Sequence, residues 1–192
     1  MKQTELCKLA LKYGADKCPQ IGHAYTPFYY ELLKDKRQSV KKVLEVGIGN
    51  RRQVKYIPGG YIGASIRMWR DFFPNAWVYG ADVAPESFFV DERISTYYCD
   101  ETKEEDILRL VKQIGTDIDL VVDDACHHIA NQMFLCQTLM PLLDKGVIYI
   151  IEDCRRTRQV CRTFTQYNCE IPILPKNEDA NAHDGVVILR HK

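Results

Sequence analysis

The sequence predicts an α/β fold in which helices cover both faces of an open, mostly parallel sheet. Segments with the period of a strand alternate with segments that have the period of a helix through most of the chain. Several predicted strands are nearly continuous apolar runs, and IDLVVDD at 118–124 is the clearest of them. Such runs are typical of parallel strands that are buried on both faces. The length of 192 residues suits one domain with a substantial core, and no repeat or linker divides it.

The predicted elements follow one another in the order that such a sheet requires. Helices are expected over 4–13, from Pro27 to about Lys36, and over 63–73, 104–114 and 128–143. Strands are expected at 43–47, 76–82, 93–98, 118–124, 146–153, 169–174 and 185–190. The polar loop PKNEDANAHD separates the last two strands, so we expect them to form an antiparallel hairpin at one edge.

The composition limits the classes of partner. Lys plus Arg and Asp plus Glu number 26 each, so the chain has no net charge. Because a neutral protein has no long-range attraction for polyanions, we expect neither a nucleic-acid partner nor binding to a membrane surface. The apolar stretches are of strand length, and the N-terminus lacks the apolar core of a signal peptide. These features predict a cytoplasmic protein.

The cysteines predict thiols rather than cross-links. Eight cysteines are many for this length, and none forms a C-x-x-C pair. Cys99, Cys126, Cys136 and Cys154 fall in or beside predicted core segments. We therefore expect free thiols in a reducing compartment, with disulfides as the less favoured alternative.

A turn that contains two glycines follows the first predicted strand directly. In open α/β sheets the ligand binds at the carboxyl ends of the strands, beside such a turn, and Gly47 and Gly49 would let backbone approach it. The third glycine of the dinucleotide fingerprint is absent, which disfavours NAD or FAD. Glu45 suits a cationic amino-acid ligand, and Asp82, which ends the next strand, can accept both hydroxyls of a ribose. The structural alternatives are a plain tight turn and a strand-end cap.

Carboxylates end two of the central predicted strands. Asp123 and Asp124 end one buried strand, and Glu152 and Asp153 end the next one in the sequence. Neighbouring strands lie about 4.8 Å apart, so these groups would converge and repel one another. A divalent cation such as Mg²⁺, which prefers oxygen ligands, would remove that repulsion. Separate caps, or salt bridges to the arginines that follow, are the alternative.

Two histidines stand between these acidic pairs. His127 and His128 follow Asp124 by three and four residues. An imidazole titrates near neutral pH and can remove a proton from a hydroxyl whose pKa a cation has lowered. A cap or a surface position is the usual place of a solitary histidine, but two beside an acidic cluster favour a catalytic role for at least one of them.

Read in order, these residues lie in segments that resemble class I S-adenosylmethionine-dependent methyltransferases acting on sugars of macrolides and related natural products. Macrocin and mycinamicin O-methyltransferases are the members in question. The resemblance runs from about Tyr13 to Asp153, and its segments are moderately specific singly and strong together. They are YGADK…GHAYTPFY, VLEVGIG, GGYIGASIRMWRDFFPNAWVYGADV, CDETKEEDI, DLVVDDACHH and GVIYIIED.

The resemblance implies a fold, a reaction and a set of site residues. The fold would be a Rossmann-like, mostly parallel sheet of seven strands in the order 3-2-1-4-5-7-6. Residues 1–192 would form a single domain, with N-terminal helices and a cofactor lid in 1–40 and the core in 41–192. The reaction would be O-methylation of a sugar or glycoside-type small molecule, with S-adenosyl-L-methionine as donor and Mg²⁺ bound.

The implied residues divide by role. Glu45, Gly47, Gly49 and Asp123 would line the cofactor, with Ser65 and Arg67 near its methionine part. Asp82 would bind the ribose, Asp100 would lie near the adenine, and Tyr25 and Thr26 would belong to the lid. Asp124, Glu152 and Asp153 would hold the metal, and His127 would be the general base, with His128 and Asp124 also at the catalytic centre.

The chain departs from the family pattern beside both proposed subsites. The usual D-G-S-H-H is here Asp124-Ala-Cys-His-His, and the usual D-Q before the adenine-binding acid is here Cys99-Asp100-Glu101. The chain is also shorter than the macrolide enzymes. The chemistry is therefore better supported than the acceptor, and homo-oligomerisation stays open.

Two basic clusters bear on the acceptor. One contains Arg51, Arg52 and Lys55, and the other contains Arg155, Arg156, Arg158 and Arg162. A solvated helix face is the favoured interpretation of the second cluster. The sharper alternative is an acidic acceptor, such as a uronate or a phosphorylated sugar, held by guanidinium groups.

Other functions remain to be weighed against sugar O-methylation. A catechol-type O-methyltransferase uses the same sheet and a similar metal, and Trp69, Phe72 and Tyr97 could serve it, although they suit core packing equally well. A module that binds the cofactor without turnover is the non-enzymatic alternative. A nicotinamide dehydrogenase comes third, because of the missing glycine.

Overall fold

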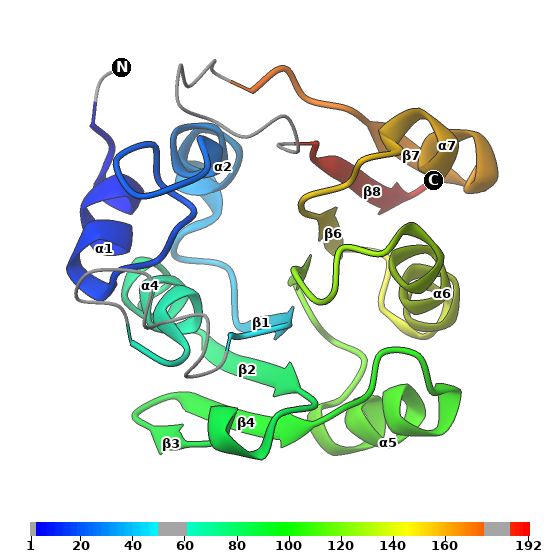
Figure 1. The fold of residues 1–192 in the computed structure, drawn as a ribbon, viewed down its shortest axis with the longest axis horizontal. Coiled ribbons are helices and arrows are strands. Elements are labelled where there is room, and N and C mark those ends of the chain that lie inside the picture. Colours follow the sequence, from blue (N-terminus) through cyan, green and yellow to red (C-terminus); the bar gives the residue numbers. More distant parts are fainter. Residues whose placement is uncertain (1–2, 50–60, 175–184) are drawn as a thin grey trace.

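The protein is built on one twisted eight-stranded sheet, seen here in a computed structural model that describes residues 3–49, 61–174 and 185–192 (Figure 1). The strand order is β3-β4-β2-β1-β5-β6-β8-β7. The strands are β1 (Lys42–Val46), β2 (Trp77–Asp82), β3 (Val90–Asp91), β4 (Ile94–Tyr98), β5 (Leu120–Asp123), β6 (Ile148–Ile151), β7 (Tyr167–Glu170) and β8 (Val187–His191). Neighbours from β4 to β6 pair in parallel, whereas β3, β8 and β7 pair antiparallel.

The prediction of a mostly parallel sheet with a C-terminal hairpin is confirmed. Without β3, the observed order is the expected 3-2-1-4-5-7-6. The expected count of seven strands was wrong by one, because β3 consists of two residues that pair with β4 at the edge. Two residues are too few to produce a periodic pattern in the sequence.

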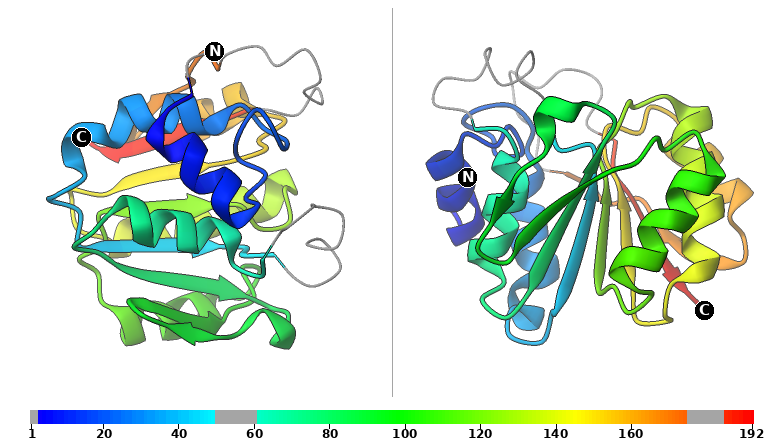
Figure 2. Two further views of the ribbon diagram at one scale, coloured as in Figure 1. Left: turned by 90° about the vertical axis from the view of Figure 1, so that its left-hand side faces the viewer. Right: turned by 90° about the horizontal axis from the view of Figure 1, so that it is seen from below.

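Helices cover both faces of the sheet (Figure 2). One layer contains α1 (Glu5–Tyr13), α2 (Tyr25–Leu33) and α4 (Ala64–Phe72), and the other contains α5 (Glu104–Ile114), α6 (Ile129–Leu139) and α7 (Thr157–Thr163). Three short 3₁₀ turns complete the described elements, η1 (Lys34–Lys36), η2 (Pro85–Ser87) and η3 (Met140–Leu142). None of these helices combines the length and apolar character needed to cross a membrane.

The core lies in two layers because side chains of a strand alternate between its faces. In β1, Val43 packs with Trp69 and the other side chains of the first layer. Leu44, the next residue, packs with Ile107 and Leu135 of the second layer. The sheet is therefore apolar on both faces, which explains the continuous apolar runs of the central strands.

The N-terminal helices differ from expectation at one boundary. The helix α1 ends at Tyr13, as predicted, and Gly14 follows it in the left-handed conformation; at its start the side chain of Thr4 accepts a hydrogen bond from the amide of Cys7. The second helix was expected to begin at Pro27 but begins at Tyr25. The carbonyl of Lys17 accepts the amides of Tyr25 and of the next residue at 3.1 and 2.9 Å, so the helix starts two residues earlier.

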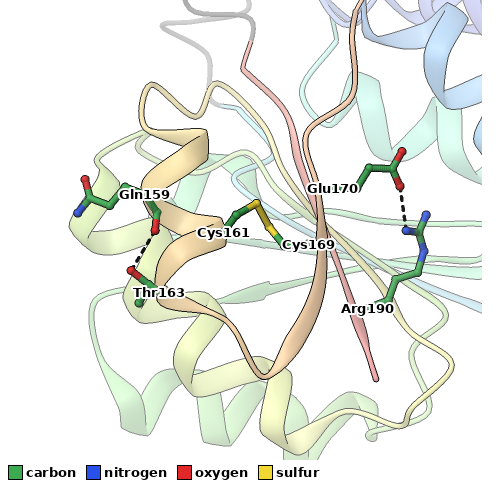
Figure 3. Close-up of a disulfide and its surroundings, with 6 residues drawn as sticks. All are labelled: Gln159, Cys161, Thr163, Cys169, Glu170 and Arg190. Atoms are coloured by element: carbon green, nitrogen blue, oxygen red, sulfur yellow. Dashed lines mark hydrogen bonds and ion pairs between the residues drawn. A yellow bond between two sulfur atoms is a disulfide. The ribbon is translucent and has the colours of Figure 1, made fainter.

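The C-terminal region shows three differences from the sequence prediction. The strand expected at 169–174 lies at Tyr167–Glu170, and α7, which carries Arg158 and Arg162 of the second arginine cluster, was not placed in the predicted order of elements. Cys161 of α7 and Cys169 of β7 form a disulfide, with their Cα atoms 5.4 Å apart (Figure 3). The expectation of free thiols was wrong for this pair and holds for the other six cysteines.

The first basic cluster, Arg51, Arg52 and Lys55, lies outside the described residues.

Candidate active site

A cavity of about 380 Å³ lies at the carboxyl edge of the sheet, between the strand ends and the N-terminal segment. Its position matches the rule that ligands of open α/β sheets bind outside the carboxyl ends of the strands. The lining residues are Gly14, Ala15, Asp16, His23, Gly47, Ile48, Gly49, Tyr61, Ala64, Ser65, Asp124, His127, Glu152 and Asp153. The three residues predicted for the metal therefore meet His127 and three of the residues predicted for the methyl donor, Gly47, Gly49 and Ser65, at one place.

The glycine turn joins this cavity to a second one. Gly47 and Gly49 have φ angles of +86° and +76°, which glycine adopts at low cost. A Cβ on Gly47 would stand 2.2 Å from the carbonyl oxygen of Asp124, so only glycine lets the ends of β1 and β5 approach this closely. Both glycines and Asp124 also line the second cavity, of about 230 Å³, together with Asp82.

Glu45 is completely buried beneath the turn. Its carboxylate accepts hydrogen bonds from the hydroxyl of Ser65 and from Nε1 of Trp69, the latter at 2.6 Å. Burial raises the pKa of Glu45, whereas the ammonium of Lys17 and these two donors act in the opposite direction. Ser65 lines the cavity, whereas Glu45 does not line it and lies behind the hydroxyl of Ser65.

Asp82, the residue predicted at the ribose, lies at the end of β2 and lines the second cavity. Its two carboxylate oxygens accept the amides of Ile48 and Ala84, at 3.1 and 2.9 Å. Asp100, predicted near the adenine, instead binds Thr102 and does not line this cavity. The neighbouring Cys99 and Glu101 line it instead.

The strand-end carboxylates converge as the sequence predicted. β5 and β6 are adjacent, and Asp124 and Asp153 approach His127 from either side. His127 Nε2 lies 3.0 Å from Asp124 Oδ1, and its Nδ1 lies 3.4 Å from Asp153 Oδ2. Ligand atoms of Asp124, His127 and Asp153 all lie within 4.8 Å of one another.

His127 is held in an unusual conformation. Its φ is +55° and that of Asp153 is +47°, in the left-handed region that residues with a side chain rarely occupy. Such conformations persist only where surrounding structure imposes them, and they gather at functional sites. The hydrogen bond to Asp124 raises the pKa of His127. His128 is exposed at the start of α6 and does not line the cavity, so the structure favours His127 of the two.

The N-terminal segment supplies a second set of polar groups to the same carboxylates. The hydroxyl of Tyr25 donates to Asp153 Oδ1 at 2.5 Å, and the hydroxyl of Tyr29 donates to Glu152 Oε1 at 2.7 Å. Thr26, predicted with Tyr25 in the lid, is buried against Cys7 and does not line the cavity. The segment thus closes over the strand ends mainly through its tyrosines.

Lys17 is the largest addition to the predicted site. Its side chain is 1% exposed, and its ammonium donates to Asp124 Oδ2 at 2.5 Å and to Glu152 Oε2. Burial acts against the ammonium, but Asp124, Glu152 and Glu45 raise the pKa of Lys17 well above 10.5. For Asp124, the same contact and that of His127 outweigh burial and lower its pKa.

Two predicted cofactor residues lie away from the cavities. Asp123 lines neither cavity; burial raises its pKa to about 8, and its Oδ2 has no hydrogen-bond partner among the described residues. Arg67 points toward the sheet edge, where it pairs with Asp91 and stacks on Phe89. Trp69 and Phe72, considered as acceptor contacts, are fully buried core residues.

Comparison with known proteins places this geometry among methyltransferases. The chain is 34% identical over 148 residues to an 8-demethyl-8-alpha-L-rhamnosyl tetracenomycin-C 2'-O-methyltransferase of Streptomyces olivaceus, covering 77% of this chain and 37% of that protein. It is 31% identical over 154 residues to mycinamicin VI 2''-O-methyltransferase of Micromonospora griseorubida, covering 79% and 36%. The chain is a homologue of sugar O-methyltransferases. It spans little more than a third of the length of these relatives.

The fold comparison agrees with the sequence comparison. MycE methyltransferase from the mycinamycin biosynthetic pathway, solved in complex with Mg and SAH, matches with a TM-score of 0.73 and 26% identity. The match covers 99% of this chain and 55% of that one. The homologue described here therefore has the α/β methyltransferase fold. No family model matches the chain.

The donor set suits a hard divalent cation. Asp124 and Asp153 each present a carboxylate oxygen to the space beside His127, and Glu152 borders the same cavity. Oxygen ligands from two or three carboxylates, completed by water or substrate, are what Mg²⁺ accepts. The described residues of the site therefore fit the ion.

Proposed function

We propose that the chain is an S-adenosyl-L-methionine-dependent, Mg²⁺-assisted O-methyltransferase that acts on a hydroxyl of a sugar or glycoside-type small molecule. The observation that carries this proposal is the convergence of Asp124, Asp153 and His127 beside the glycine turn. The homology to sugar O-methyltransferases supports the same reaction.

In this proposal the donor lies across the two adjoining cavities. Ser65 binds the methionine part, with Glu45 fixing its hydroxyl from behind. Asp82 binds the ribose, and Glu101 lies beside the base in place of Asp100. Gly47 and Gly49 let the backbone pass between the two cavities without a Cβ in the way.

His127 acts as the general base. Carboxylates face both of its ring nitrogens, and the neutral imidazole takes the proton of the acceptor hydroxyl as that oxygen attacks the methyl group. S-adenosylmethionine would supply the methyl as an electrophile, its methyl–sulfur bond breaking to leave S-adenosylhomocysteine, and Mg²⁺ held by Asp124, Glu152 and Asp153 would lower the pKa of the acceptor hydroxyl. The other residues of the cavity orient the two reactants and exclude water.

The acceptor, in the finer form of the proposal, carries an acidic group. Arg155, Arg156, Arg158 and Arg162 line a hollow of about 560 Å³ on α7. Within the described ranges, these four exposed guanidinium groups form no ion pair, and Arg155 follows Asp153 by only two residues. Guanidinium groups bind carboxylates and phosphates in a bidentate manner, so a uronate or a phosphorylated sugar fits this rim.

Substitution of these arginines tests the acidic acceptor. Arg158→Ala combined with Arg162→Ala should raise KM for an acidic acceptor about tenfold and leave KM for its neutral analogue unchanged. Arg109→Ala, on an exposed arginine of α5, is the matched control and should change neither. An equal effect on both acceptors would remove the acidic group from the proposal.

The domain organisation and the location are part of the same proposal. Residues 1–192 act as one domain, with 1–40 as the lid, and the hydrogen bonds of Lys17, Tyr25 and Tyr29 to the strand ends support that role. A cytoplasmic location requires that the Cys161–Cys169 pair be tolerated as thiols, because disulfides rarely persist in that compartment. Thiol labelling in intact cells tests this point.

A methyl-transfer screen tests the reaction itself. Nucleotide sugars, glycans and catechols are offered with S-adenosylmethionine, in Mg²⁺ and in EDTA. The proposal expects transfer to a sugar hydroxyl that EDTA abolishes and Mg²⁺ restores. Transfer to catechols alone would assign a catechol-type enzyme, and binding of the donor without any transfer would assign a binding module.

A further inference from the structure

Lys17 occupies the point where three strand ends meet. Its ammonium contacts Asp124 Oδ2 at the end of β5 and Glu152 Oε2 at the end of β6, and it lies 3.7 Å from Glu45 Oε1 in β1. These strands are direct neighbours in the sheet. A single buried cation therefore lies between the carboxylates predicted for the cofactor side and those predicted for the metal.

The chain fixes this lysine at both ends. Its carbonyl accepts the amides of Tyr25 and Thr26 at the start of α2, at 3.1 and 2.9 Å. The neighbouring carbonyl, of Asp16, accepts the amide of His23 at 2.6 Å. Lys17 thus reaches the strand ends from a loop that the first turn of α2 holds in place.

The contacts sort the carboxylate oxygens into two groups. Asp124 turns Oδ2 toward Lys17 and Oδ1 toward His127. Glu152 turns one oxygen to Lys17 and the other to Tyr29. The ammonium therefore occupies the inner side of the carboxylate cluster, and the side that faces His127 and Asp153 is left for a second cation.

From this arrangement we infer that Lys17 is the internal counter-charge of the metal site and sets the charge of the cation that the site prefers. The inference rests on the proposed metal site. The three predicted ligands Asp124, Glu152 and Asp153 carry −3 as carboxylates, and the ammonium that contacts two of them reduces this to −2, which one divalent cation neutralises. Glu45, 3.7 Å from the same ammonium, is held on the donor side by Ser65 and Trp69 and contributes the same charge in every variant compared below. Lys17 is a positioning residue in this scheme, because it acts on the ion through Asp124 and Glu152.

The test compares a divalent with a trivalent cation of similar oxygen preference. Tb³⁺ binding is measured by its sensitised luminescence, and Mg²⁺ binding by displacement of Tb³⁺, for the wild type and for Lys17→Met. Loss of a neighbouring positive charge favours Tb³⁺ over Mg²⁺, because attraction scales with the charge of the ion; we expect the preference to rise about tenfold or more. A loss of packing alone would weaken both ions and leave their ratio unchanged.

Lys12→Met is the matched control. Lys12 is an exposed lysine that pairs with Asp71, away from the cavity, and its removal should leave the ratio unchanged. An unchanged ratio in folded Lys17→Met would overturn the inference while leaving the metal site intact. A wild type that binds neither ion would instead overturn the proposed metal site, and with it this inference.

A second pair of variants covers the case in which Lys17→Met does not fold. Glu152→Gln leaves the site at −1 and should shift the preference toward Mg²⁺, about tenfold. Lys17→Met combined with Glu152→Gln removes both charges of one ion pair, which restores −2 and avoids leaving Glu152 as a buried carboxylate without its counter-charge. Its ion preference should return to that of the wild type. An identical preference in Glu152→Gln and in the double variant would show that the lysine charge has no influence.

Discussion

Substitution of Gly47 by alanine should disturb fold and site together. An alanine at φ +86° costs about 1–2 kcal/mol in backbone strain. Its Cβ would also stand 2.2 Å from the carbonyl oxygen of Asp124 and 2.5 Å from Cα of Ala125. Because both contacts are with backbone, no side-chain rotation relieves them, and overpacking of this kind adds about 1–3 kcal/mol.

The expected loss of unfolding free energy is therefore about 2–5 kcal/mol, which for a protein of this size lowers Tm by at least about 4 °C. The strand end that must move carries Asp124, and Gly47 lines both cavities. Affinity for S-adenosylhomocysteine should consequently fall at least about tenfold, since about 1.4 kcal/mol of lost binding energy suffices for that. Urea denaturation and calorimetric titration measure the two effects.

Gly146→Ala is the control for this experiment. A Cβ at Gly146 meets no atom within 4 Å, so the same chemical change should alter stability by no more than about 0.5–1 kcal/mol. If Gly47→Ala were as stable as Gly146→Ala and bound the product equally well, the close approach of the two strand ends would not be what requires glycine.

Three further predictions follow from single contacts. His127→Ala should lower kcat about 10²–10⁴-fold and leave affinity for S-adenosylhomocysteine within about twofold, and retained turnover would remove His127 from the mechanism. Burial acts to raise the pKa of Asp71, but hydrogen bonds from Lys12, Tyr13 and Arg70 lower it below 3.8. The stabilisation that the Asp71 carboxylate contributes is therefore present above pH 3.8 and is lost as pH falls through the lowered pKa of the folded protein. Asp71→Asn should destabilise the protein by up to about 1 kcal/mol at pH 7 and progressively less in acid. An equal loss of stability at every pH in thermal melts would contradict this. Thiol titration of the unfolded protein should find six of the eight cysteines free, and eight free thiols would show that the Cys161–Cys169 disulfide does not form. Reduction of this disulfide should lower the free energy of unfolding, measured in urea, by about 2–3 kcal/mol.

The sequence was most informative where chemistry repeats along the chain. The alternation of strand and helix periods predicted the sheet, and the helical spacing over 4–13 predicted α1 to within one residue because this periodicity is a local signal. The ends of β5 and β6 predicted the carboxylate cluster, since parallel neighbours terminate at the same edge. His127 followed from its spacing to Asp124.

Contacts between distant segments were not predictable in the same way. Nothing near Lys17 in the sequence shows that its ammonium reaches Glu152, although its place in the YGADK segment marked the region. The hydrogen bonds that Tyr29 and Trp69 donate to Glu152 and Glu45 were not predictable either, because an aromatic residue on an apolar helix face indicates core packing rather than hydrogen bonding. The Cys161–Cys169 pair depends on α7 lying beside β7, which no local pattern specifies.

The hydrogen bonds from the N-terminal segment to the strand ends also set a time at which the site can form. Lys17, Tyr25 and Tyr29 bind partners that lie 107 to 135 positions later in the chain. At synthesis rates of about 5–20 residues per second, the lysine waits about 7–27 s for Glu152. Until β6 emerges from the ribosome, its ammonium stays in water and the nascent chain cannot assemble the donor cavity. Retention of a stalled chain on immobilised S-adenosylhomocysteine would therefore report that synthesis has passed Asp153.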